Sequence, residues 1–157
     1  MEIAEFQKVS EKEFINDLNG LDGDYNCIKL PVRATKGSAG YDFYSPVNVV
    51  IKPNEDIRIP TGIRCKIDEG YVLNLYPRSS LGFKYQMGLL NTVGIIDSDY
   101  YNADNEGHIM VGVINRGNKD LVIQKGDRFV QGLFTRYYLA FEEENNKERH
   151  GGFGSTN

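Results

Sequence analysis

Apolar and polar positions alternate along most of the chain from Asn26 onward. A period of two runs through residues 71–76 and 109–114, which places successive side chains on opposite faces of a strand. Shorter apolar runs, separated by turn-forming residues such as Pro53 and Gly117, occupy residues 47–51, 57–59, 121–123 and 129–134. Many short strands with few helices predict an all-β domain, built as an antiparallel sandwich, a jelly roll or a barrel.

The first part of the chain carries the one good helix signal. Ser10 and Glu13 have the spacing of a capping box, and a partial apolar face follows at Phe14, Ile15 and Leu18. The helix is expected to end at Asn19 and Gly20. The pattern therefore divides the chain into an N-terminal helical extension (residues 1–25), a β domain (26–141) and a C-terminal arm (142–157).

Length and charge narrow the range of functions. A chain of 157 residues that is 40% hydrophobic can bury the core of one domain. Its net charge of -4 and pI of about 5.2 argue against binding of duplex nucleic acid, which depends on many clustered Lys and Arg contacts to phosphates. A small anionic ligand remains compatible with this charge because it needs only a few cations.

The cysteines, the histidines and the apolar segments of the chain give no indication of a metal site, a disulfide or a membrane anchor. Cys27 and Cys65 occur without a signal peptide, a membrane-spanning apolar run or a paired CxxC spacing. We expect both to be reduced core residues of a cytoplasmic protein, with no disulfide, no metal site and no membrane contact. His108 and His150 lack a partner at metal or catalytic spacing, so a structural or solvent-exposed role is expected for each.

The chain ends in a glycine-rich segment, residues 151–157, after a charged stretch at residues 142–148. Glycines bring backbone N–H groups close to an anion, Ser and Thr add hydroxyl donors, and Phe153 offers a flat face for a base. This composition suits a flexible clamp for a nucleotide. A disordered solubilising tail is the alternative, and it is the commoner role of such an end.

A second group of polar residues follows the predicted strand at residues 71–76. Pro77 ends the strand ladder, Arg78 supplies a fork-shaped cation, and Ser79 and Ser80 add hydroxyls where a helical turn can begin. This arrangement can bind phosphate, although a polar turn with a surface Arg has the same composition.

The segment from Asn91 to Tyr100 combines an amide, a carboxylate and a phenol around an apolar strand. Asn91 can pair with the edge of a base, and Asp97 can orient or deprotonate a water. The alternative for Asp97 is an Asx-type turn that closes a hairpin with Gly107.

Two further polar residues lie among apolar neighbours. Asp42 is flanked by aromatic residues, either as a buried cap or as an outer-shell ligand of a hydrated metal. Gln131 is predicted on the same strand face as Phe129 and Leu133, where its amide needs a partner, and a structural hydrogen bond to backbone is as plausible as a ligand contact.

Taken together and in this order, five segments resemble the signature motifs of the trimeric deoxyuridine triphosphatase (dUTPase) family. The resemblance covers about residues 26–157. The segments are Ala39-Gly40-Tyr41-Asp42, Pro77-Arg78-Ser79-Ser80-Leu81-Gly82, Gly94-Ile95-Ile96-Asp97-Ser98-Asp99-Tyr100, Gly126-Asp127-Arg128-Phe129-Val130-Gln131 and Gly151-Gly152-Phe153-Gly154-Ser155-Thr156.

This resemblance implies a jelly-roll-like, distorted β barrel that forms a homotrimer with active sites shared between subunits. The implied reaction is hydrolysis of dUTP to dUMP and pyrophosphate with Mg²⁺, which keeps uracil out of DNA and supplies dUMP for thymidylate synthesis. By resemblance, Asp97 would activate the attacking water, Tyr100 would pack under the deoxyribose and exclude a 2′-hydroxyl, and Asn91 with the hairpin backbone at Gly94 would read uracil.

The resemblance also assigns the triphosphate and the metal. Arg78, Ser79, Ser80 and Gln131 would hold the phosphates, and Asp42 would support the water shell of Mg²⁺. From the arm of a neighbouring subunit, Phe153 would stack on uracil. The residues of that arm that would close over the phosphates are Gly154, Ser155 and Thr156, with Arg149 as a γ-phosphate ligand.

Three features depart from the family pattern. Residues 101–106 lengthen the hairpin tip before Gly107, Glu148 stands where the family arm commonly has Arg, and the N-terminal helix lies outside the shared core. Two other functions remain open on this fold. One is a dCTP deaminase, which would use a Glu at the base and lack the glycine-rich arm, and the other is a regulatory module that binds a partner protein through the tip or the N-terminal helix.

Overall fold

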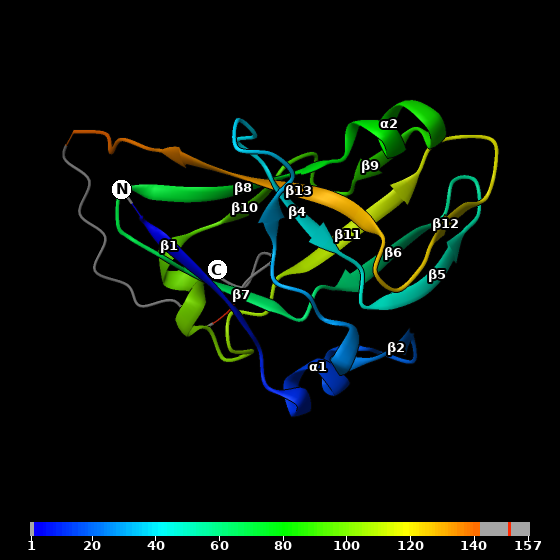
Figure 1. The fold of residues 1–157 in the computed structure, drawn as a ribbon, viewed down its shortest axis with the longest axis horizontal. Coiled ribbons are helices and arrows are strands. Elements are labelled where there is room, and N and C mark those ends of the chain that lie inside the picture. Colours follow the sequence, from blue (N-terminus) through cyan, green and yellow to red (C-terminus); the bar gives the residue numbers. More distant parts are fainter. Residues whose placement is uncertain (1, 142–150, 152–157) are drawn as a thin grey trace.

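The computed structural model describes residues 2–141 and residue 151. Its elements follow one another along the chain as short strands with few helical turns (Figure 1). In chain order they are β1 Ala4–Lys8, α1 Glu11–Asp17, β2 Asp22–Gly23, η1 Tyr25–Cys27, β3 Val32–Arg33, β4 Tyr41–Tyr44, β5 Val47–Ile51, β6 Asp56–Pro60, β7 Ile63–Ile67, β8 Tyr71–Pro77, α2 Ser79–Tyr85, β9 Met87–Leu89, β10 Gly94–Ile96, η2 Ser98–Asn102, β11 Met110–Asn115, β12 Leu121–Ile123 and β13 Arg128–Arg136, where η marks a 3-10 helix.

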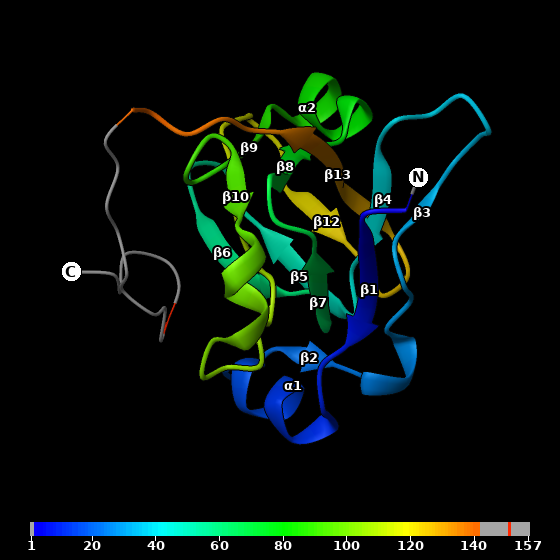
Figure 2. The same cartoon turned by 90° about the vertical axis from the view of Figure 1, so that its left-hand side faces the viewer.

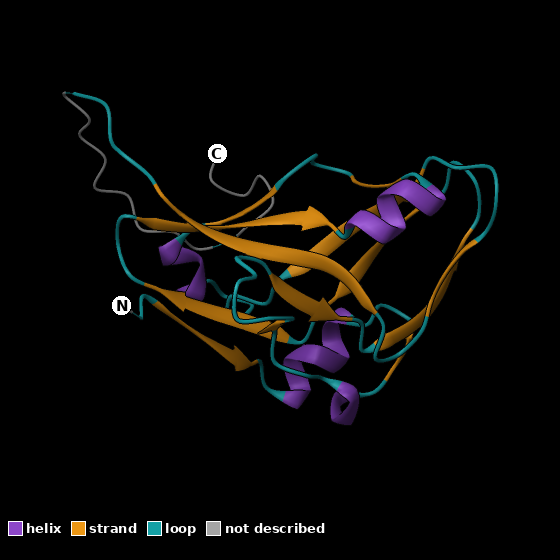
Figure 3. Cartoon of the chain, turned by 45° about the horizontal axis from the view of Figure 1, so that its top comes forward, coloured by secondary structure: helices purple, strands orange, loops and turns teal. Residues whose placement is uncertain are grey.

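The strands of the described residues form four antiparallel sheets rather than one closed barrel. The largest has the order β10-β8-β13-β4-β3, and the others are β6-β11-β9, β12-β5-β2 and β1-β7. Figure 3 shows the strands wrapped around one core with the few helical segments at the periphery. The expected all-β, jelly-roll-like fold is therefore confirmed, and the barrel remains open.

The alternation seen in the sequence corresponds to buried and exposed strand faces. In β8, Leu73 and Leu75 are fully buried while their neighbours are partly exposed. In β11, Val111 and Val113 are buried in the same alternating way. Because a strand turns successive side chains to opposite faces, these residues fill the core while the others reach solvent or the neighbouring sheet.

Strand β13 is the long central strand of the largest sheet. It pairs with β8 along one side and with β4 along the other. Its register with β4 shifts between Arg128 and Val130, which is a β-bulge, and both Phe129 and Val130 are fully buried as a result. The bulge sets Gln131 opposite Asp42 on β4 and Tyr76 on β8.

The N-terminal prediction is correct for the helix and incomplete for the residues before it. Ser10 caps α1, since its Oγ accepts a hydrogen bond from the Glu13 N–H at 3.2 Å. The helix ends at Asp17, and the chain then turns at Asn19 and Gly20, which have left-handed φ values of 48° and 85°. Phe14 is fully buried, so this segment is part of the core rather than a surface addition.

Residues 4–8, which precede α1, form a strand that the sequence analysis did not predict. Strand β1 pairs with β7, with Phe6 opposite Cys65. The Phe6 ring lies 5.4–5.7 Å from the rings of Tyr41, Phe43 and Phe134. This aromatic cluster ties the start of the chain to both β4 and β13.

A second helix, α2, begins where only a helical turn was expected. It follows Arg78 directly and ends at Tyr85, with Gln86 as the C-cap residue in a left-handed conformation at a φ of 54°. Helices α1 and α2 lie at opposite ends of the molecule (Figures 1 and 2). In the described part of the chain, neither has the length and apolar character needed to cross a membrane.

The two cysteines differ in environment. Cys65 is buried in the core, and this burial raises the pKa of its thiol to about 12, so it packs as a small neutral side chain. Cys27 is only half-buried, with its Sγ 3.6 Å from an oxygen of Asp24. The expectation of a core position is therefore correct for Cys65 alone.

Candidate active site

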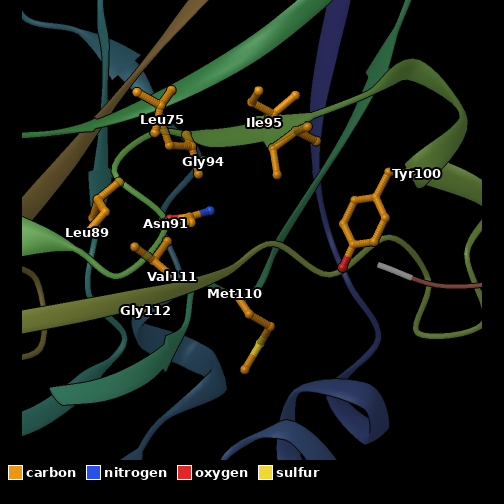
Figure 4. Close-up of a pocket in the computed structure, with 11 residues that line it drawn as sticks. Leu75, Leu89, Asn91, Gly94, Ile95, Tyr100, Met110, Val111 and Gly112 are labelled. Carbon is orange, nitrogen blue, oxygen red and sulfur yellow. The ribbon is translucent and has the colours of Figure 1, made fainter. Parts of the chain in front are cut away.

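A pocket of about 260 Å³ opens between β10 and β11. We call it the apolar pocket, because most of its lining side chains are aliphatic (Figure 4). It is lined by Leu75, Leu89, Asn91, Val93, Gly94, Ile95, Ile96, Tyr100, Met110, Val111 and Gly112. Three predicted site residues, Asn91, Gly94 and Tyr100, therefore meet in one place.

Asn91 belongs to the turn between β9 and β10, and Gly94 is the first residue of β10. The turn is tight: Thr92 has a φ of 66°, and the Val93 N–H donates to the Asn91 carbonyl at 2.7 Å. Figure 4 shows the Asn91 amide directed into the space between Gly94 and Met110. A Cβ at Gly94 would lie 3.0 Å from the Cβ of Leu75, so glycine lets the backbone of β10 close against β8.

Tyr100 forms the far wall of the apolar pocket. Its side chain is 3% exposed, and its hydroxyl donates to the His108 carbonyl at 2.6 Å. The Asn105 Nδ2 in turn donates to the Tyr100 hydroxyl oxygen at 2.9 Å. The ring is thus held by Asn105, which lies in the segment that lengthens the hairpin tip, and by His108, which follows that segment.

Asp97 lies next to the pocket-lining residue Ile96 and is exposed. It occupies the N-cap position of η2, but its carboxylate makes no capping hydrogen bond, and the turn is closed instead by the Tyr100 N–H donating to the Asp97 carbonyl at 3.2 Å. Asp97 is therefore one residue along the chain from the lining of the apolar pocket, on the solvent-exposed surface.

A second pocket, of about 490 Å³, brings together three other segments. We call it the polar pocket, and it is lined by Ala34, Ser38, Ala39, Gly40, Asp42, Arg78, Ser79, Ser80 and Gln131. Strand β4 supplies Asp42, the end of β8 leads to Arg78, and β13 supplies Gln131. Ser79 and Ser80 open α2, where the first backbone N–H groups have no acceptor inside the helix.

Asp42 is the most buried charge of the polar pocket, at 8% exposure, and it is paired twice. Its Oδ1 lies 3.3 Å from the Arg78 Nε, and its Oδ2 lies 3.1 Å from the Arg128 Nη1. Arg128 was not among the residues singled out from the sequence, although it stands inside the segment that ends at Gln131. Of the two interpretations of Asp42, these contacts resemble the buried, paired carboxylate, and its partners are two guanidinium groups.

Gln131 does not lie among apolar side chains as its strand position suggested. The bulge in β13 breaks the simple alternation, and Gln131 is half-buried in the lining of the polar pocket. Its Nε2 donates weakly to the Pro77 carbonyl at 3.4 Å. Its Oε1 would lie 2.9 Å from a Cβ at Gly40, so a glycine there lets the chain pass close to this amide.

The two pockets share no residue within the described part of the chain. In the largest sheet, the apolar pocket lies at the β10 edge and the polar pocket lies at β13 and β4. The remaining predicted site residues lie outside the described residues, and these are Arg149, Phe153, Gly154, Ser155 and Thr156.

Comparison with known proteins places this arrangement in a family. The family model described as dUTPase matches residues 26–157, and the chain belongs to the dUTPase family. It is 46% identical over 132 residues to the deoxyuridine 5'-triphosphate nucleotidohydrolase of Lactococcus lactis, covering 82% of this chain and 88% of that protein. The resemblance inferred from the five segments is thereby confirmed.

Solved structures agree on the fold. The dUTPase of Streptococcus mutans superposes with a TM-score of 0.70 at 34% identity, covering 86% of this chain and 97% of that one. A dUTPase mutant from phage phi11 of S. aureus, solved with a structural Mg(II) ion, gives a TM-score of 0.70 at 20% identity, covering 93% and 98%. The latter likeness concerns the fold alone.

Proposed function

We propose that the protein hydrolyses dUTP to dUMP and pyrophosphate in the cytoplasm. The observation that carries this proposal is the division of the predicted site residues into two pockets of opposite character in a chain of this family. A deoxyuridine triphosphate has an apolar end, the base and deoxyribose, and a highly charged end, the triphosphate. The apolar pocket suits the first and the polar pocket suits the second.

At the apolar pocket, recognition depends on shape and on a few polar groups. The Asn91 amide offers one donor and one acceptor to the edge of uracil. The Tyr100 ring is buried and fixed, so it packs under the deoxyribose and leaves no space for a 2′-hydroxyl. The exposed carboxylate of Asp97 at the rim orients the attacking water and accepts its proton.

At the polar pocket, charge and hydroxyl donors hold the triphosphate. Arg78 and Gln131 reach the phosphates from the ends of two paired strands, and Ser79 and Ser80 add hydroxyl and backbone N–H donors. We add Arg128 to this set because it is paired with the same carboxylate as Arg78. Two guanidinium groups around one carboxylate leave a net positive charge for an anionic ligand.

The residues of the polar pocket fit Mg²⁺ held mainly by the substrate. Among the described residues there is no group of three His, Cys, Asp or Glu side chains that could hold a metal ion. Mg²⁺ is commonly bound by phosphate oxygens, waters and one or two carboxylates, and bound there it would neutralise charge on the triphosphate. Asp42 is the carboxylate of this pocket, and it would accept hydrogen bonds from water in the metal's shell.

A homotrimer that combines the apolar pocket of one subunit with the polar pocket of another completes the proposed site. Exposed apolar side chains beside both pockets support a protein contact there. Leu90 and Ile95 flank the apolar pocket, and Phe83 and Val122 lie near Ser80. The arm of a neighbouring subunit would add Phe153 on the base and Arg149, Gly154, Ser155 and Thr156 on the phosphates.

The test is to incubate the protein with Mg²⁺ and each of dUTP, dTTP, dCTP and UTP, and to measure pyrophosphate and ammonia. We expect rapid pyrophosphate release from dUTP alone. Comparable turnover of dTTP or UTP below saturation would contradict the assignment of Asn91 and Tyr100. Ammonia release from dCTP would identify a deaminase instead.

A further inference from the structure

Two segments have no task in the proposed function, namely helix α1 and residues 101–108. The family match begins at residue 26, so α1 precedes the matched range. Residues 101–108 follow Tyr100 directly, and the first two of them form the end of η2. In Figure 2 the loop after η2 descends toward α1. We call these two segments together the brace, because their side chains are joined at both ends of the helix.

At the start of α1, the brace is held by Ser10 and Glu106. The Ser10 N–H donates to the Glu106 Oε2 at 2.8 Å, and the Ser10 hydroxyl donates to the Oε1 at 2.7 Å. These bonds, first of all the one from the hydroxyl, hold the pKa of Glu106 below its ordinary value. The carboxylate therefore stays ionised near neutral pH and lies at the positive end of the helix dipole.

At the end of α1, Asp17 holds a buried imidazole. His108 is fully buried, and its Nε2 accepts a hydrogen bond from the Gly62 N–H at 2.8 Å. An accepting Nε2 carries no proton, so Nδ1 is the donor in the 2.6 Å hydrogen bond to the Asp17 Oδ2. The two partners thus fix one tautomer and one orientation of the ring.

The brace reaches the apolar pocket through Tyr100. The carbonyl of His108 accepts the Tyr100 hydroxyl, and Asn105 donates to the same hydroxyl oxygen. Gly107 permits this close approach, with a φ of 70° and a position where a Cβ would lie 2.6 Å from the Tyr100 carbonyl oxygen. The hydroxyl therefore has both a donor and an acceptor from the brace.

Tyr101 adds a third attachment, to strands β1 and β7. Its hydroxyl donates to the Gln7 Oε1 at 2.7 Å, and its carbonyl accepts from the Arg64 Nη2 at 2.7 Å. The Arg64 guanidinium also lies 3.7 Å from the centre of the Tyr101 ring. The segment after Tyr100 is consequently anchored on the helix, on two strands and on the pocket wall.

We propose that the brace positions Tyr100 for sugar discrimination, with Asp17, His108 and Asn105 as its positioning residues. The inference rests on the proposed function. A ring that wraps closely under a deoxyribose rejects a 2′-hydroxyl only while it cannot tilt away, and the two hydrogen bonds to its hydroxyl prevent that tilt. Loss of Asp17 frees the side chain of His108, and the backbone carbonyl of the same residue accepts the hydrogen bond from Tyr100. The Tyr100 ring therefore becomes more mobile although Tyr100 itself is unchanged.

The experiment compares Asp17→Ala with Asp17→Asn, whose amide oxygen can still accept from Nδ1, and with Glu11→Gln on the exposed first turn of the same helix. We expect the dUTP-to-UTP ratio of kcat/KM to fall about tenfold in Asp17→Ala, to recover mostly in Asp17→Asn and to stay unchanged in Glu11→Gln. Asn105→Ala, which removes one donor to Tyr100 without touching the helix, should lower the same ratio. A purely structural role would lower activity on both nucleotides equally.

The outcomes separate the two proposals. If the unmodified protein hydrolyses no dUTP, the proposed function is wrong. If it is active and folded Asp17→Ala and Asn105→Ala variants keep the ratio, the brace is wrong. Reorientation of the Tyr100 ring axis, measured by nuclear magnetic resonance relaxation on the protein without nucleotide, tests the brace independently of activity. This motion should increase in both variants, and unchanged motion would overturn the inference.

Discussion

The apolar and polar pockets are prepared for their ligand in different ways. In the apolar pocket the key groups are held by neutral contacts: the Tyr100 hydroxyl has two fixed partners, and Gly94 closes the wall against Leu75. In the polar pocket the key groups are held by charge, since Asp42 pairs with both Arg78 and Arg128. Under the proposed function, shape would select the neutral end of the ligand, and pre-oriented charge would select the anionic end.

Because of this difference, substitutions in the two pockets are expected to have different effects on specificity and affinity. If the apolar pocket works by exclusion, as proposed, loosening it would admit wrong substrates while the right one still binds. If the polar pocket works by attraction, as proposed, removing a cation would weaken the binding of every nucleoside triphosphate alike. Asp42 also competes with phosphate for the two guanidinium groups, which keeps them oriented before substrate arrives.

The largest effect is expected at the rim of the apolar pocket. Asp97→Asn should lower kcat by about 10²- to 10⁴-fold, because a positioned acid-base group is lost. Binding of a non-hydrolysable dUTP analogue, measured by calorimetry, should change little. Asp104→Asn, an exposed carboxylate of the same tip, is the control and should keep normal activity. A near-normal rate for Asp97→Asn would make this carboxylate a turn residue only.

Mixing subunits tests whether the two pockets act in one site across a subunit boundary. Asp97→Asn and Arg78→Gln damage different pockets, and each alone should be weakly active. If each site takes one pocket from each of two subunits, re-assembly of an equal mixture should restore about one quarter of the normal activity. Activity no higher than the mean of the two variants would mean that both pockets of a site belong to one chain.

Damage to the charged pocket alone should be intermediate. Arg78→Gln should reduce kcat/KM for dUTP by about 10- to 100-fold, the loss expected for a charge-assisted hydrogen bond of roughly 1.5–3 kcal/mol. The dUTP-to-UTP ratio should stay unchanged, in contrast to variants of the brace. Arg136→Gln, an exposed cation at the end of β13, is the matched control. A change in sugar selectivity in Arg78→Gln would contradict the division of tasks between the pockets.

The smallest expected effect is a change of folding stability with pH, caused by the buried His108 beside the apolar pocket. Burial lowers the pKa of His108 below its ordinary value of 6.5, and the contact with Asp17 offsets this only in part. The unfolded chain therefore takes up the proton first, and stability should fall as pH drops below about 6.5, by at most about 1.4 kcal/mol per pH unit. From about one pH unit above this value, the imidazole is neutral in both states and contributes no pH dependence.

Thermal unfolding between pH 7.5 and 5.5 measures this slope. In His108→Gln the slope should be shallower than in the unmodified protein, although the variant is less stable overall. Glu106, whose pKa is lowered by Ser10, loses its stabilising contribution only at more acidic pH and so does not disturb this window. Equal slopes for the two proteins would exclude His108 as the titrating group.

The sequence predicted most of the elements because their signals are local. The capping box at Ser10 and the alternation in β8 and β11 each depend on residues within a few positions of one another. Strand β1 was not predicted because its five residues gain their structure from pairing with β7, about sixty positions away. The bulge that turned Gln131 into the polar pocket leaves no comparable local signal.

The resemblance assigned Asp42, Arg78 and Gln131 to the triphosphate and its metal, and Asn91 and Tyr100 to the base and sugar. The structure adds that the first group lines one pocket and the second group lines another. Arg128 was missed because its ion pair with Asp42 joins residues 86 positions apart in the chain. Long-range contacts of this kind follow from the register of β13 with β4, which only the structure defines.

The brace has a consequence for how this chain tolerates change. Helix α1 and the lengthened tip hold complementary halves of two contacts, Ser10 with Glu106 and Asp17 with His108. Replacing one segment alone with that of another protein would leave a buried imidazole without its carboxylate, or a carboxylate without its partner. Insertion or loss of the two segments should therefore be inherited together, and grafts for protein engineering should exchange them as one unit.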